Sequence, residues 1–437
     1  MSALSSTSQR YEDLKAQIEQ KSFTKESMTK FIQQLPKIEL HAHLNGCIRE
    51  STLASLASER NVKLSSLLHD LQQETHFTEE EKMNESPQEK VNKKRRSLLE
   101  CFEIFTEIGL CVTDLVALKQ ICIEALEDFA KQGVVYLELR STPKVLLDTM
   151  YGTKATKKDY IDTILKCMAD FEEQDQERYK REMEDVKQNA NASSQSLPRL
   201  PMTCRYIVSI NRAESFEVAQ EHTQLAMEYA KKSKYVVGLD LSGSPLKNSF
   251  TELEPCFRMA KDAGLKTSIH CGEIPCEKGV DNETDDALIE FSYRDTKKIL
   301  DFEPDRLGHA LLFTDEMYEA LERGKKIPIE CCPTSNVMTL ELATHYEGDL
   351  VHGLRRHPRL SKWLENDYPC SINTDDPGIF NTDSSLEFLL LVDAFGFQNP
   401  ARIVSIVMDS IDHAFESDDF KAKMTGLVTS KINGILY

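Results

Sequence analysis

The sequence predicts an α/β fold, a (β/α)8 barrel of the TIM type. Three observations predict it: eight short apolar stretches that read as strands, helical patterns between them, and short connections after residue 200. The first stretch begins at Lys37, and the others are Gly133–Arg140, Met202–Ile210, Tyr235–Leu241, Lys266–His270, Arg306–His309, Ile327–Cys332 and Cys370–Thr374. We therefore expect one catalytic domain over residues 1–437.

Helical periodicity fills the intervals between these strands. Residues 1–35 are expected to form an N-terminal helical extension that Pro36 ends. Two helical patterns follow between residues 98 and 129, another begins near Lys157, and a last apolar stripe follows Asn399 and Pro400. Two charged stretches, at about 59–97 and 172–200, are expected to be insertions.

Composition narrows the possible partners. The net charge of −19 argues against binding to nucleic acid over a broad surface, although a small anion in a local pocket remains compatible. The sequence has no apolar run of the roughly 20 residues that span a membrane, and its polar N-terminus does not resemble a signal peptide. Twelve scattered cysteines suit reduced thiols. We expect a cytoplasmic monomer with a small-molecule partner.

The residues at the ends of the expected strands suggest a metal site. His41 and His43 follow the first strand at a spacing of two, so on a strand both side chains point the same way, although this pattern also arises by chance in turns. His270 ends the fifth strand and Asp375 follows the eighth. Three histidines and one carboxylate form a suitable ligand set for one Zn²⁺ per chain, which would lower the pKa of a bound water.

Two further groups at the same edge could move protons. His309, at the end of the sixth strand, could orient the water or take its proton, and Glu273 could give a proton to the substrate. Because active sites of such barrels lie at the carboxyl ends of the strands, these residues are expected to share one mouth.

Five motifs together resemble the adenosine deaminase family, over roughly residues 36–430. They are His41-Ala42-His43-Leu44-Asn45-Gly46, His270-Cys271-Gly272-Glu273, Gly308-His309, Cys332-Pro333-Thr334-Ser335-Asn336 and Asn373-Thr374-Asp375-Asp376-Pro377. The resemblance implies a metal-dependent hydrolase in which a zinc-activated water attacks carbon 6 of a purine and releases ammonia or an amine.

The resemblance also implies roles for single residues. Glu273 would protonate the ring nitrogen beside the attacked carbon, and His309 would assist the water. Asp376 would hydrogen-bond the attacking oxygen or the purine edge, and Gly243 would offer its backbone N–H to the purine. His43 is expected to face the substrate as well as the metal.

The substrate is expected to be a nucleotide. Asn45 stands where nucleoside deaminases of this family usually carry aspartate, and a neutral amide can donate to a 5′-phosphate that a carboxylate would repel. Ser141, Thr142, Pro143 and Lys144 add hydroxyl groups and an ammonium group at the same edge. These stretches resemble the adenosine deaminase-like branch, which converts N6-methyl-AMP to IMP and methylamine.

Two positions depart from the family pattern, and two other functions remain open. Gly109 stands where that branch has a histidine, and Ala310 follows His309 where a glycine is usual. Adenosine itself is the alternative substrate. An inactive purine-binding scaffold is the alternative of another class, although Glu273 and His309 would then have no reason to accompany the metal ligands.

Overall fold

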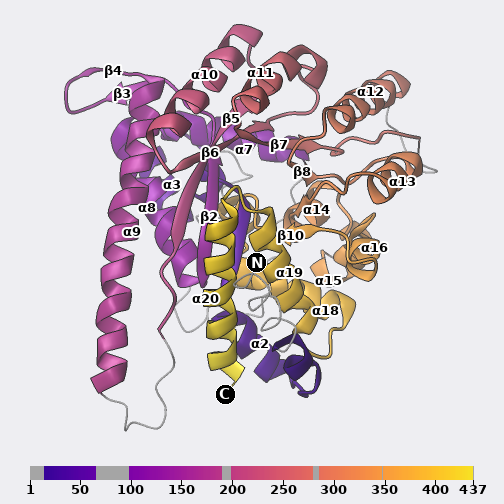
Figure 1. Cartoon of the computed structure of the whole chain (residues 1–437). Coiled ribbons are helices and arrows are strands. Elements are labelled where there is room, and N and C mark those ends of the chain that lie inside the picture. Colours follow the sequence, from indigo (N-terminus) through magenta and orange to yellow (C-terminus); the bar gives the residue numbers. More distant parts are fainter. Residues whose placement is uncertain (1–13, 65–97, 189–197, 279–284, 347, 437) are drawn as a thin grey trace.

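Eight parallel strands form the centre of the molecule, and helices surround them (Figure 1). The computed structural model describes residues 14–64, 98–188, 198–278, 285–346 and 348–436. The strands are β1 (Lys37–His43), β2 (Val134–Ser141), β5 (Thr203–Asn211), β6 (Val236–Ser242), β7 (Lys266–Cys271), β8 (Arg306–His309), β9 (Ile329–Cys331) and β10 (Cys370–Ile372). They pair in this order, which confirms the predicted barrel.

The barrel closes between its last and first strands through a few backbone contacts. Asp375, which follows β10, donates its N–H to His41 O at 2.9 Å, and its carbonyl accepts from His43 N at 2.9 Å. The Asn373 side chain adds a contact by accepting from Leu40 N at 3.0 Å. The seam of the barrel therefore lies beside the expected metal ligands.

The helices follow the strands as the sequence predicts, and several begin at a capping side chain. Asp114, Ser215 and Thr314 each accept a backbone N–H in the first turn of α8, α10 and α13. The helices are α2 (Lys25–Gln34), α3 (Glu50–Glu59), α7 (Leu98–Cys111), α8 (Leu115–Lys131), α9 (Lys157–Gln188), α10 (Phe216–Lys232), α11 (Phe250–Asp262), α12 (Asp286–Phe302), α13 (Asp315–Arg323), α14 (Pro333–Thr339), α15 (Leu350–Arg355), α16 (Leu360–Glu365), α17 (Pro377–Phe380), α18 (Ser384–Phe395), α19 (Ala401–His413) and α20 (Asp418–Leu436).

Three regions differ from the expectation. The N-terminal helix is broken, because Thr24 and Ser27 form a capping box that starts α2 as a separate helix. The charged stretch after residue 172 continues α9 as a long helix that stands at one edge of the molecule (Figure 1), and there Asp175 pairs with Arg199. A short hairpin, β3 (Leu146–Asp148) and β4 (Thr153–Ala155), was not predicted.

Parts of the expected extension and insertions, residues 1–13, 65–97 and 189–197, lie outside the described residues. The division into one domain with an extension and two insertions therefore stays a prediction. Within the described residues, no helix combines the length and the apolar character needed to cross a bilayer.

The interior of the barrel holds charged side chains where barrels of this type usually carry branched apolar ones. Five of them are at most 1% exposed: Glu138, Arg140, Asp240, Arg306 and Glu330. They pair with one another, as in the contacts of Arg306 with Glu138 and Glu330. Buried charges are stable only when paired, so this interior is an ordered network beneath the mouth of the barrel.

Candidate active site

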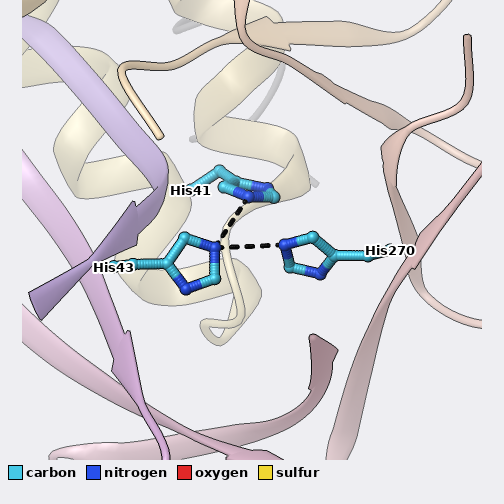
Figure 2. A group of neighbouring side chains, drawn as sticks. All are labelled: His41, His43 and His270. Carbon is cyan, nitrogen blue, oxygen red and sulfur yellow. Dashed lines mark hydrogen bonds between the residues drawn. The ribbon is translucent and has the colours of Figure 1, made fainter. Parts of the chain in front are cut away.

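Three imidazoles converge at the carboxyl ends of β1 and β7 (Figure 2). Nε2 of His43 lies 3.3 Å from Nε2 of His41 and 3.1 Å from Nε2 of His270. The spacing of two residues puts His41 and His43 on one face of β1, as the sequence predicts. Strand pairing around the barrel brings His270 to the same point, although it lies 227 residues from His43 in the sequence.

Asp375 supplies a carboxylate to this group from the seam of the barrel. Its Oδ1 lies 3.3 Å from His41 Nε2 and 3.4 Å from His43 Nε2. Ser335 donates its hydroxyl to Oδ2 at 2.7 Å, which fixes the orientation of the carboxylate. The backbone of Asp375 has a φ of 60°, a left-handed conformation that is costly for a non-glycine residue and often marks functional sites.

The donor set fits a divalent cation. The Nδ1 atoms of His41 and His270 lie 2.6 Å from Glu330 and 3.1 Å from Asp240, so both rings can keep their proton on Nδ1 and turn the Nε2 lone pair inward. Several ring nitrogens and a carboxylate oxygen thus lie within 3.4 Å of one another, an arrangement that a shared proton or a metal cation stabilises. Nitrogen and oxygen donors of this kind suit Zn²⁺.

A cavity of about 470 Å³ opens above this group. It is lined by most of the residues expected at the site, namely His43, Asn45, Ser141, Thr142, Lys144, Gly243, His270, Glu273, His309, Asp375 and Asp376. His41 and Pro143 are not among the lining residues. Pro143 is buried beside the cavity, where its carbonyl oxygen lies 3.1 Å from His222 Nε2, so a substrate contact by Pro143 is not supported.

Two further carboxyl groups lie close to the metal ligands. Burial raises the pKa of Glu273, and burial together with the adjacent charge of Asp375 raises the pKa of Asp376. Oδ1 of Asp376 is buried without a hydrogen-bond partner among the described residues. Gly46 makes room for this carboxylate, because a Cβ at residue 46 would lie only 1.8 Å from Oδ1. Both groups can therefore exchange a proton or a hydrogen bond with a ligand.

His309 is oriented by α14. Its Nδ1 lies 3.0 Å from Nδ2 of Asn336, whose Oδ1 accepts from Cys332 N at 3.4 Å. An amide nitrogen only donates, so His309 accepts at Nδ1 and carries its proton on Nε2. Burial lowers the pKa of His309 to about 3, so the ring is neutral. Of the two roles expected for His309, this arrangement favours orienting a water over removing its proton.

The outer rim of the cavity carries cations. Lys144 follows β2, and Lys247 ends the turn after β6, where its N–H donates to Ser244 O at 3.1 Å. Both side chains are exposed, and among the described residues neither forms an ion pair. Lys247 was not predicted from the sequence.

Glycine is required at one position in the loop after β6 that lines the cavity. Gly243 has a φ of +88°, and a Cβ there would lie 2.4 Å from Asn211 Oδ1. The loop after β6 can therefore run close to the loop after β5 and present backbone groups to the cavity.

One face of α7 forms an apolar wall of the cavity. Leu98, Phe102 and Phe105 lie on this face, and Gly109 continues it at helical spacing. A Cβ at Gly109 would meet no other atom within 4 Å, so the missing side chain leaves open space. Ala310 is fully buried and does not line the cavity, but its φ of 53° places it in the left-handed region.

Known proteins resemble this chain over most of its length. The family described as adenosine deaminase matches residues 36–431. An N6-mAMP deaminase from Arabidopsis thaliana is 32% identical, over 90% of this chain and 96% of that protein. The human N6-methyl-AMP deaminase is 30% identical over 91% and 93%.

Solved structures agree with the sequence relatives. The apo structure of the Arabidopsis thaliana N6-methyl-AMP deaminase has a TM-score of 0.67 and 30% identity, and the match covers 92% of this chain and 98% of that chain. Arabidopsis ADAL in complex with IMP has a TM-score of 0.66, with the same identity and coverage. The match spans every strand of the barrel and each metal-ligand candidate, and the chain belongs to the adenosine deaminase family.

Proposed function

We propose that this protein is a zinc-dependent hydrolytic deaminase that converts N6-methyl-AMP to IMP and methylamine. The observation that carries the proposal is the division of charge along the cavity. Its inner end holds three imidazoles and the acids Glu273, Asp375 and Asp376, whereas its outer rim holds Lys144 and Lys247. A purine nucleotide has the same division, with a base to be attacked at one end and a phosphate at the other.

Four residues would hold the zinc ion: His41, His43, His270 and Asp375. Zinc at such a site supplies a nucleophilic water at neutral pH by lowering the pKa of that water. His309 would orient this water through its Nε2–H, since its Nδ1 is occupied by Asn336.

Glu273 and Asp376 would serve the purine. The raised pKa of Glu273 keeps its proton available, so it can protonate the ring nitrogen beside the carbon that is attacked. Asp376 has a buried oxygen without a partner among the described residues, and this oxygen can hydrogen-bond the attacking water or the edge of the base. Protonation of the ring makes carbon 6 more electrophilic and prepares the departure of the amine.

The rim would bind the 5′-phosphate. In a chain with a net charge of −19, two lysines without ion-pair partners among the described residues create a local positive field. Asn45, which also lines the cavity, can donate from its amide nitrogen. The names of the relatives and the IMP complex of Arabidopsis ADAL support a nucleotide substrate.

We also place the protein in the cytoplasm as part of this proposal. All twelve cysteines are buried and free, which supports a reducing compartment.

The test is a two-by-two comparison of substrates. Release of methylamine or ammonia is measured for N6-methyl-AMP, AMP, N6-methyladenosine and adenosine, with zinc-loaded protein and after treatment with a chelator. We expect the highest kcat/KM for N6-methyl-AMP and loss of activity with the chelator. The four substrates separate the contribution of the phosphate from that of the methyl group.

The alternatives give different results. Efficient turnover of adenosine without reaction of N6-methyl-AMP would identify the protein as an adenosine deaminase, the alternative enzyme. Zinc-loaded protein that binds purines but converts none of the four would identify the inactive scaffold.

A further inference from the structure

Arg140, to which the sequence analysis assigned no role, lies between two of the expected metal ligands. Its Nη1 donates to Asp240 Oδ1 at 2.9 Å, and its Nη2 donates to Glu330 Oε2 at 2.9 Å. These are the same oxygens that lie 3.1 Å from His270 Nδ1 and 2.6 Å from His41 Nδ1. One guanidinium thus stands between His270 and His41. The contact of Glu330 with His41 has hydrogen-bond geometry, whereas Asp240 approaches His270 Nδ1 at 3.1 Å without that geometry.

The position of Arg140 itself is fixed by the barrel. The side chain is fully buried, and Nη2 also donates to the carbonyl oxygen of Leu40, the residue before His41. A planar guanidinium with donors in a rigid fork can hold two carboxylates at a set separation, which the single ammonium group of a lysine cannot do.

We propose that Arg140 is a positioning residue that holds Asp240 and Glu330 so that both imidazoles keep their proton on Nδ1 and present their Nε2 lone pairs to the metal. A carboxylate that accepts from Nδ1–H fixes both the tautomer and the orientation of a ligating histidine. Because one arginine positions both carboxylates, it sets the geometry of the two ligands together.

The two carboxylates are not equally supported. The second oxygen of Glu330 accepts from Arg306 Nε at 2.6 Å, so another cation would keep this carboxylate in place without Arg140. The second oxygen of Asp240 accepts from the hydroxyl of Ser209 at 2.8 Å. Among the described residues, Arg140 is the only arginine or lysine paired with Asp240. Loss of Arg140 should therefore disturb His270 more than His41.

The inference rests on the proposed metal site and is tested by metal binding in the absence of substrate. Zinc affinity is measured by competition with a chelating dye, and the absorption bands of the cobalt(II) protein report the coordination geometry. We expect Arg140→Met to weaken zinc binding about 10- to 100-fold and to alter the cobalt spectrum. Arg140→Lys should restore only part of the affinity, because lysine reaches one carboxylate at a time.

Arg205→Met is the matched control. Arg205 is 6% exposed and pairs with Glu172 and Glu416, neither of which contacts a metal-ligand candidate in the described part of the chain. Its loss should lower the melting temperature but leave zinc affinity and the cobalt spectrum unchanged. Asp240→Asn, which keeps the shape of the side chain, should reproduce the effect of Arg140→Met and add little to it in the double variant.

These measurements separate the inference from the proposed metal site. If the original protein binds neither zinc nor cobalt, the proposal of a metal site is wrong, and so is the inference that rests on it. If the original protein binds zinc and a folded Arg140 variant binds it equally tightly with the same cobalt spectrum, the inference alone is wrong. Should Arg140→Met not fold, Arg140→Lys gives the same decision, since it must also weaken zinc binding.

Discussion

The inner end of the cavity and its outer rim are built in different ways. At the inner end, His41, His270 and His309 are buried, and a second side chain lies close to Nδ1 of each ring. At the rim, Lys144 and Lys247 are exposed and stand on loops, without ion-pair partners among the described residues. Contacts therefore hold the rings of the inner end in place, whereas no ion pair among the described residues holds the two lysines of the rim.

The two parts of the cavity should therefore determine different properties of the enzyme. A reaction needs groups fixed in place before the substrate binds, because reorganisation during the reaction costs rate. Discrimination between a nucleotide and a nucleoside needs only a positive charge at the right distance. Exposed lysines provide this charge, and each contributes a modest binding free energy. The inner end should therefore determine the reaction and the rim the choice of substrate.

The largest effect is expected at the inner end, for Glu273→Gln. Glutamine keeps the size of the side chain but cannot give a proton, so kcat should fall by about 10²- to 10⁴-fold on nucleotide and nucleoside alike. Steady-state kinetics and metal analysis check this, and zinc content should stay unchanged. Glu277→Gln, at an exposed acid four residues later, is the control and should have no effect. An equal loss of kcat in the control would show that Glu273 has no specific role in the reaction.

The pH dependence of kcat/KM tests the role of Glu273 independently. Burial raises the pKa of Glu273, so the protonated form that gives the proton persists to higher pH than for an ordinary carboxyl. We expect kcat/KM to hold its value below this raised pKa and to fall by about tenfold per pH unit above it. The profile of the folded protein is measured with N6-methyl-AMP. A Glu273→Gln variant that keeps the same falling limb would assign that limb to another group.

The rim should give smaller and selective effects. Lys144→Ala or Lys247→Ala removes one cation, so KM for N6-methyl-AMP should rise by about tenfold, the value of one charge-assisted hydrogen bond. KM for N6-methyladenosine should stay the same, and the effect should shrink at high salt. Lys231→Ala, an exposed lysine on α10 that does not line the cavity, is the control. Equal losses on both substrates would mean that these lysines do not bind the phosphate.

The difference between the inner end and the rim also explains how much of the site the sequence could predict. His41, His270 and Asp375 ended apolar runs, and strand ends of a barrel must meet, so residues far apart in sequence were correctly expected in one place. Lys247 was not predicted because, in the sequence, a lysine in a polar turn cannot be told from an ordinary solvated lysine. The ion pair of Asp240 and Arg140 was not predicted, because ion pairs inside a barrel depend on the register between strands, which a single sequence does not reveal.

Asn45 also lines the cavity, and its substitution should have a smaller effect than the loss of a rim lysine. Asn45→Asp places a negative charge in the cavity, so the use of nucleotides should weaken by roughly fivefold more than the use of nucleosides, the equivalent of about 1 kcal/mol of repulsion. The ratio of kcat/KM for N6-methyl-AMP and N6-methyladenosine measures it. Asn45→Ser, which introduces no charge, is the control. If both variants lower the two rates equally, Asn45 does not face the phosphate.

The smallest effect concerns the backbone at the inner end. His309, Ala310 and Asp375 all have positive φ angles, of 61°, 53° and 60°. An alanine in this conformation costs about 1–2 kcal/mol, and glycine adopts it freely but loses about 0.5–1 kcal/mol more entropy on folding. Ala310→Gly should therefore raise the free energy of unfolding by about 0.5 kcal/mol, as measured by denaturant titration.

The control makes the same chemical change in a helix. Ala54 lies inside α3, where glycine should instead lower the free energy of unfolding by about 0.5–1 kcal/mol. Opposite signs for the two substitutions would show that the inner end stores strain in its backbone to hold His309 in position. If both substitutions destabilise equally, the left-handed turn at Ala310 is unstrained, and side-chain contacts alone hold the inner end in position.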